Sequence, residues 1–137
     1  MLARTWRGAT DAGNAQKYVE YLTITGFAAF RATPGNVGAI GLRRIRDGKA
    51  EFMLVSLWES ETAIKAFAGT GDDTAVFFPE DDIFLVDRDP HVDHFQVVYA
   101  DLPQRGGWFR RALAGWFNAW RAATPAEHPR WNFAAFR

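Results

Sequence analysis

The alternation of apolar and polar side chains predicts a strand at the start of the chain and a helix after it. Over Leu2–Gly8 the period is two, so Leu2, Arg4 and Trp6 share one face of that strand. Apolar side chains then recur at helical spacing, which predicts a helix from about Asp11 to Thr25. Thr10 or Asp11 is its expected cap, and Gly26 its expected end.

A β-hairpin is predicted next. Val37–Arg46 and Lys49–Trp58 are strand-like runs joined by Asp47-Gly48, a dipeptide typical of two-residue hairpin turns. Both faces of the second run are largely apolar, so we expect it to be covered on both sides.

The remaining pattern completes an alternating order of elements. Ser60 is the expected cap of a second helix that ends near Gly69. Asp72–Pro90 is irregular and acidic, with one helical turn predicted around Val76–Phe78, and Val92–Tyr99 reads as a last strand. The order β-α-β-β-α-β predicts an α+β, ferredoxin-like fold with a four-stranded antiparallel sheet over residues 1–100.

Residues 101–137 form a separate extension that begins with a Pro- and Gly-containing break. Trp108–Trp120 predicts an amphipathic helix, with aromatic side chains on one half and arginines on the other. Three alternatives follow: this helix packs on the body or on a dimer mate, lies on an anionic membrane surface, or docks into a partner protein.

Composition removes several function classes. The 137 residues include no cysteine, so disulfides and thiolate chemistry are excluded. The formal net charge is zero, which argues against a nucleic-acid-binding protein. The charges are unevenly distributed along the chain. Residues 1–100 carry 10 basic and 14 acidic side chains, and the extension carries six arginines with only Asp101 and Glu127. With neither a signal-peptide pattern nor a spanning apolar run, we expect a cytoplasmic protein.

Several segments together resemble the antibiotic biosynthesis monooxygenase-like group of the dimeric α/β-barrel superfamily. They are the opening strand Ala3–Gly8, the loop Thr33–Gly38, the strand-to-helix junction Leu54–Ser60, and Pro90–His94. The resemblance implies a homodimer whose two sheets pack into a barrel, with a pocket between sheet and helices in each subunit. It also implies oxidation of a small aromatic or polyketide-like molecule by O2 with no cofactor and no metal.

The resemblance places candidate site residues in that pocket. Arg4 would hold an oxyanion or carboxylate, and His94 would be the base. Flat aromatic substrates would stack against a set of aromatic side chains, namely Trp6, Trp58, Phe67 and Phe77. The alternative is that these aromatics form core or dimer packing and that Arg4 pairs with an acid. For His94 the alternative is a structural or surface histidine, which the residues favour over a base.

Haem degradation, another activity of similar proteins, is disfavoured. Proteins of that branch are marked by three residues: an Asn on the first strand, a Trp inside the second helix and a His after that helix. Here the strand has Thr5-Trp6, Phe67 stands near the Trp position, and Asp72–Asp82 contains no His. A metal site at His91, Asp93 and His94 is disfavoured too, because a strand would turn His94 away from the other two.

Two main hypotheses therefore remain. The enzyme hypothesis predicts a closed apolar pocket containing Arg4, Trp58 or His94, and a structure that fills this volume with the protein's own side chains would contradict it. The second hypothesis is a non-catalytic ligand-binding or structural dimer of the same fold.

Overall fold

An antiparallel sheet forms the base of the molecule. The computed structural model describes residues 1–103, of which Met1–Val98 form one compact unit. The strand order is β2-β3-β1-β4, and β5 also pairs with β1. The strands are β1 (Leu2–Asp11), β2 (Asn36–Arg46), β3 (Lys49–Trp58), β4 (Leu85–Arg88) and β5 (Asp93–Gln96).

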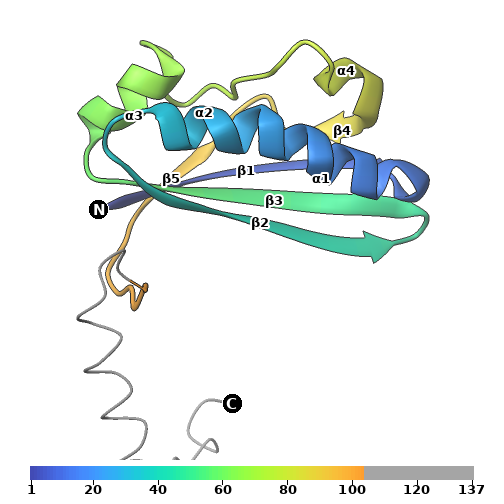
Figure 1. The fold of residues 1–137 in the computed structure, drawn as a ribbon, viewed down its shortest axis with the longest axis horizontal. Helices are drawn as coiled ribbons and strands as arrows, with labels where there is room; N and C mark the ends of the chain where they lie inside the picture. Colours follow the sequence, from blue (N-terminus) through green and yellow to red (C-terminus); the bar gives the residue numbers. More distant parts are fainter. Residues whose placement is uncertain (104–137) are drawn as a thin grey trace, which may run out of the picture. The chain divides into compact units, whose positions relative to one another are not determined.

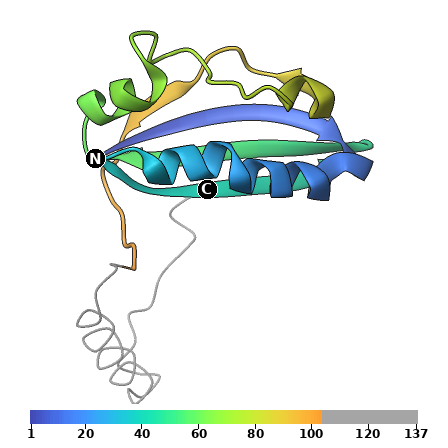
Figure 2. The ribbon, with the colours of Figure 1, turned by 45° about the horizontal axis from the view of Figure 1, so that its top comes forward.

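Helices cover one face of this sheet (Figures 1 and 2). They are a short 3-10 helix η1 (Ala12–Asn14), α1 (Ala15–Ile24), α2 (Gly26–Ala32), α3 (Glu61–Ala68) and α4 (Asp81–Phe84). Residues 69–80, which connect α3 to α4, run across the same side of the sheet; we call them the 69–80 connection. The predicted α+β, ferredoxin-like fold is confirmed.

The first strand and helix have other boundaries than the pattern predicts. Thr10, an expected cap, is instead a fully buried residue of β1, and Asp11 makes no side-chain capping bond. The chain then passes through η1 before α1 begins at Ala15. Gly26 does not end the helical region but begins α2, after a break at Thr25. The aromatic side chains of Phe27 and Phe30 are therefore carried on a helix.

The hairpin and the cap of α3 are confirmed. Asp47 and Gly48 have φ of 52° and 75°, the positive pair that a tight hairpin turn requires, and Arg46 pairs with Lys49. Ser60 accepts a hydrogen bond of 3.2 Å from the backbone N–H of Ala63.

The edge of the sheet beside β1 differs from the expectation. Val76–Phe78 is not helical; the helical turn lies later, at α4, where the Asp81 carboxylate accepts a bond from the Phe78 N–H. A short strand, β4, follows inside the segment expected to be irregular, and the last strand is reduced to β5. Two short strands therefore share the edge position expected for one.

The two faces of the sheet differ in their environment. Ala50, Phe52 and Leu54 of β3 are buried under α1, together with Tyr18 and Leu22. A second cluster lies at the other end, where α2 and α3 meet the end of β3: Phe30, Trp58, Ala63 and Ile64. The opposite side of the sheet, which we call the open face, carries no helix. Met53 and Val55 on it are partly exposed, so the second cover expected for this strand is absent among residues 1–103.

Trp108–Trp120 and the contacts proposed for it lie outside the described residues. None of the helices of residues 1–103 has the length and apolarity to cross a membrane.

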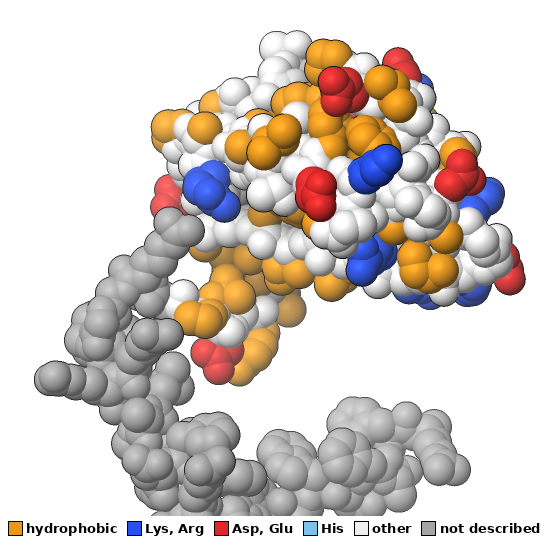
Figure 3. Space-filling view, turned by 45° about the vertical axis from the view of Figure 1, so that its right-hand side comes forward, with side chains coloured by type: hydrophobic (Ala, Val, Ile, Leu, Met, Phe, Trp, Pro, Cys, Tyr) orange, Lys and Arg blue, Asp and Glu red, His pale blue; other side chains and the backbone are white. Residues whose placement is uncertain are grey.

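Apolar side chains reach the surface among charges of both signs (Figure 3). Among the exposed ones are Ile83 and Val86 of α4 and β4.

Candidate functional site

Arg4 is a buried cation on the covered face of the sheet, near the start of β1. Its residue is only 4% exposed, and its side chain bonds two backbone carbonyls of the 69–80 connection. Nη2 donates to the Thr74 oxygen at 2.7 Å, and Nε donates to the Asp72 oxygen at 3.4 Å. Cζ lies 5.5 Å from the centre of the Phe67 ring. Burial lowers the pKa of the Arg4 guanidinium, and the nearby Asp72 carboxylate opposes this shift.

The alternative that Arg4 pairs with an acid is not what the structure shows. Within residues 1–103 the ion pairs are Arg44 and Arg46 with Glu51, and Arg88 with Asp82. The hydrogen-bond partners of Arg4 are neutral carbonyls, so its charge is compensated by dipoles rather than by a bonded carboxylate.

A small cavity lies beside Arg4. Its volume is about 40 Å³, which is room for about one water molecule and far below the few hundred Å³ of typical ligand pockets. Six of the residues that line it are aromatic: Trp6, Tyr18, Phe30, Phe67, Phe77 and Phe78. The pocket expected by the enzyme hypothesis is thus filled by the protein's own side chains, which contradicts that hypothesis for this arrangement of the chain. A ligand could enter only if part of the cavity wall moved.

A buried acid lies on the same cavity. Asp81 is 5% exposed and accepts bonds from the Tyr18 hydroxyl at 3.3 Å and the Phe78 N–H at 2.6 Å. Burial raises the pKa of Asp81, and these two donors oppose the shift. Burial, followed by the Asp81 charge, also raises the pKa of Tyr18. An acid and a phenol with raised pKa values that line the same cavity as a buried cation form a grouping typical of functional sites.

The 69–80 connection closes the cavity. It supplies the two carbonyls that bond Arg4 and the rings of Phe77 and Phe78. Phe77 lies edge-on to Trp6, with ring centres 6.0 Å apart, and the Arg88 guanidinium lies 4.7 Å from its centre. Because Phe77 is still 38% exposed, one side of the wall faces solvent.

Four of the six predicted site residues line this cavity. They are Arg4, Trp6, Phe67 and Phe77. Trp58 lies one layer deeper: it is fully buried, stacks near Phe67 and donates from its indole Nε1 to Ser56 Oγ at 2.8 Å. Ser56, not Trp58, reaches the cavity.

His94 is not with them. It pairs with Arg4 in register on β5, but it is exposed and does not line the cavity. His91 is exposed as well and forms a bridge with Thr74. Across residues 1–103, no three His, Asp or Glu side chains are grouped so that they could hold a metal ion.

Sequence reasoning missed Asp81 and Tyr18. Tyr18 falls within the helix predicted from about Asp11 to Thr25, and Asp81 is one of seven acids in the segment Asp72–Pro90. A signal existed in Phe78-Pro79-Glu80-Asp81, where an acid three residues after a Phe can accept its N–H and begin a helix.

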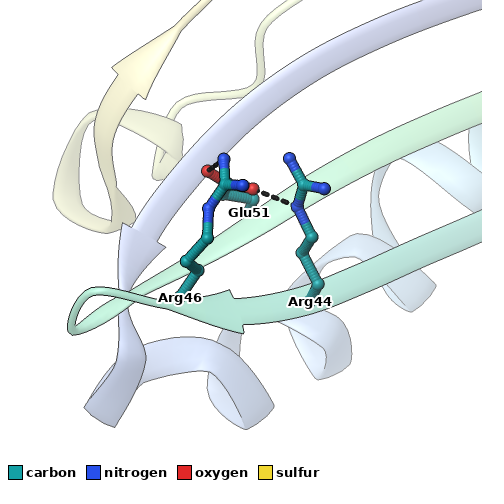
Figure 4. A network of polar contacts seen from close by, with 3 residues as sticks. All are labelled: Arg44, Arg46 and Glu51. Atoms are coloured by element: carbon teal, nitrogen blue, oxygen red, sulfur yellow. Dashed lines mark hydrogen bonds and ion pairs between the residues drawn. The ribbon is translucent and has the colours of Figure 1, made fainter.

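A second, broader hollow lies near the hairpin end of the sheet. It has a volume of about 780 Å³ and is lined by charges of both signs, including Arg7, Asp87 and Arg88. On the open face, Glu51 of β3 binds Arg44 and Arg46 of β2, the latter at 3.1 Å (Figure 4). The Arg44 hydrogen bond lowers the pKa of Glu51. Ion pairs as exposed as these contribute little to the free energy of unfolding. Their main effect is to fix the positions of these three side chains on the surface.

The fold is that of the antibiotic biosynthesis monooxygenase-like proteins, so the predicted resemblance is confirmed at the level of the fold. No family model matches the sequence, and no curated protein matches it.

Solved structures with this fold come from several bacteria. A proposed antibiotic biosynthesis monooxygenase from Bacillus cereus is 19% identical with a TM-score of 0.52, covering 74% of this chain and 97% of its own. A protein of unknown function from Nitrosomonas europaea is 16% identical with a TM-score of 0.53, covering 75% and 94%. A haem-degrading protein from Mycobacterium tuberculosis, with two haems in its active site, is 20% identical with a TM-score of 0.46, covering 74% and 100%. No shared ligand follows from these values.

Proposed function

We propose that this protein binds a small aromatic molecule at the Arg4 cavity, with the 69–80 connection displaced from its closed position. The grouping of Arg4, Asp81 and Tyr18 around one aromatic-walled space carries this proposal. Burying an arginine and an aspartate without pairing them to each other costs desolvation free energy, which a merely structural core avoids by using apolar side chains.

The reaction that the resemblance implies is oxidation by O2 without a cofactor. In this site Asp81, rather than the exposed His94, is the group placed to take a proton from a bound substrate. For an anthrone, the resulting carbanion gives one electron to O2, and the carbon radical and superoxide join as a peroxide. Loss of water from the peroxide then leaves anthraquinone, so each anthrone and O2 yield one quinone and one water.

Oxygen uptake in the presence of anthrone tests this reaction. The wild-type chain should consume O2 and form anthraquinone, and Asp81→Asn should slow both by at least about 100-fold. Asp87→Asn is the control, because Asp87 is an exposed acid of β4 that does not line the cavity and does not act on the pKa of Asp81. Equal rates in wild type and Asp81→Asn would remove Asp81 as the base, and no uptake by the wild type would remove the reaction.

The small cavity favours a second function, a structural or ligand-binding dimer without catalysis. A homodimer would pair the open faces of two copies. Ile40 and Leu42 of β2 and Phe95 of β5 are exposed apolar side chains, and register places Leu42 opposite Met53 and Phe95 opposite Ala3 on this face. Charges of both signs near the hairpin suit a two-fold interface, where each patch meets its own copy.

A further inference from the structure

We infer that the 69–80 connection is a lid latched by Arg4, and that the site takes an aromatic carboxylate whose anionic group replaces the Asp72 and Thr74 carbonyls on the Arg4 guanidinium. This rests on the proposed binding of aromatic molecules in the cavity. Beyond that binding, the inference specifies that the ligand is an anion and that the 69–80 connection moves to admit it.

The latch is formed by the donors that a carboxylate would use. Nε and Nη2 of Arg4 both donate to the connection, at 3.4 and 2.7 Å. A carboxylate accepts two such bonds side by side and adds a full negative charge, whereas the carbonyls offer only dipoles. A buried guanidinium therefore gains from exchanging these partners for an anion.

The connection is held to the body by few other bonds. The Ala75 N–H donates to the Pro90 oxygen and the Val92 N–H to the Asp73 oxygen, each at 2.9 Å. At the far end of the connection, the Glu80 N–H donates to the Tyr21 hydroxyl at 3.0 Å. Between Gly69 and Glu80 there is no helix or strand, and most of its residues are exposed. Breaking this small set of contacts costs far less than unfolding the sheet, as expected of a segment that opens locally.

Glycines stand at the start of the connection. Gly69 ends α3 with φ of 78°, a conformation that other residues adopt with strain. A Cβ added there would meet nothing within 4 Å, so the backbone conformation, not space, calls for glycine. A chain that turns away from α3 at this point can move without disturbing the helix.

The aromatic rings of the lid occupy the place of the ligand ring. Phe77 and Phe78 line the cavity, and Phe77 packs against Trp6. When they leave with the lid, Trp6 and Phe67 remain on the sheet and on α3 as flat walls beside Arg4. An aromatic ring joined to a carboxylate matches this combination of apolar walls and a cation.

Binding of naphthoate and of neutral naphthamide to the full chain, measured by calorimetry, tests the charge of the ligand. We expect naphthoate to bind about 10- to 100-fold more tightly, the ratio that charge-assisted hydrogen bonds supply. In Arg4→Met this ratio should fall to about one, and Arg4→Lys should keep part of it because lysine retains the charge but not the fork. If Arg4→Met does not fold, Arg4→Lys and the two wild-type affinities still decide.

Amide hydrogen exchange of the same complexes tests the lid. Saturating naphthoate should speed exchange at the Ala75 and Val92 amides and leave the Glu59 amide, which bonds Gly35 elsewhere, unchanged. If naphthoate binds and exchange at both of these amides is unchanged or slowed, the lid is overturned. Equal affinity for naphthoate and naphthamide would overturn the carboxylate while leaving aromatic binding intact; no binding of either probe would overturn the proposed function as well.

Discussion

Arg4 Nη2 donates a 2.7 Å hydrogen bond to the Thr74 carbonyl oxygen, 70 residues further along the chain. This bond joins the central strand of the sheet to the segment that closes the cavity. The buried, cationic guanidinium of Arg4 is thus bonded to a neutral carbonyl, which a charged acceptor such as a carboxylate can replace.

Asp81 makes the stability of the protein depend on pH. Its pKa is raised by burial, so the folded state binds a proton more tightly than the unfolded state does. The stabilising contribution is then present below the unfolded pKa of about 4 and is lost as pH rises through the higher folded pKa. Relative to Asp81→Asn, wild type should lose stability over that window, as urea unfolding between about pH 3 and pH 7 would measure. A relative stability that increases with pH contradicts this account.

The Tyr18 hydroxyl should limit that pH effect. It donates to Asp81 and so opposes the upward shift of the Asp81 pKa. Tyr18→Phe removes the donor, which should move the midpoint of the same pH dependence upward. Tyr21→Phe is the control, because the Tyr21 hydroxyl accepts from the Glu80 N–H and makes no hydrogen bond to the Asp81 carboxylate. Equal midpoints in Tyr18→Phe and wild type would exclude this coupling.

Ser56 is predicted to stabilise the buried Trp58 by accepting the hydrogen bond of its indole N–H. Ser56→Ala leaves the buried indole N–H of Trp58 without its acceptor, at a cost of about 1–3 kcal/mol in the free energy of unfolding. In a Trp58→Phe background the donor is gone, so Ser56→Ala should cost less than about 1 kcal/mol. Chemical denaturation of the four chains measures the coupling, and additive costs would show that the bond contributes nothing.

Gly35 is predicted to tolerate no side chain. Its φ is 88°, and an added Cβ would lie 2.5 Å from the Ala63 Cβ on α3. Gly35→Ala should destabilise the fold by about 2 kcal/mol or more. Gly48→Ala has a similar φ of 75° but no neighbour within 4 Å, so it isolates the backbone strain, at about 1 kcal/mol. Similar melting temperatures for the two variants would argue against the clash.

The open face is predicted to be the interface of the proposed homodimer. Leu42→Asp places a charge on an exposed apolar position of that face and should shift the mass measured by light scattering from two copies toward one. Ile83→Asp is the control, because Ile83 on α4 is more exposed but lies away from this face. Wild type measured as a single copy, or a Leu42→Asp variant still measured as two, would contradict the proposed interface.

Period and turn chemistry predicted most of the fold. The alternation in β2 and β3 and the Asp47-Gly48 turn are local signals, and tertiary packing agrees with them. The 81–88 region was missed because its helix and its strand are each four residues long, too short to show a period.

For the site, strand alternation placed Arg4 and Trp6 on one face, as the structure does. The burial of Asp81 could not be predicted, because it depends on packing against Tyr18, 63 residues away. Only its bond to the Phe78 N–H has a local sequence signal. For His94, the sequence suggested a role that its position does not favour. Histidine is a residue type typical of bases, but His94 lies on the short edge strand β5, where it is exposed.

An NMR titration of the full chain with naphthol tests the central claim most directly. If the Arg4 cavity is an aromatic-binding site, resonances of Arg4, Phe67 and the Trp6 indole N–H should shift together and saturate, while those of the Asp47-Gly48 turn stay fixed. Saturable shifts confined to other residues, or no saturable shift at these three, would contradict the claim.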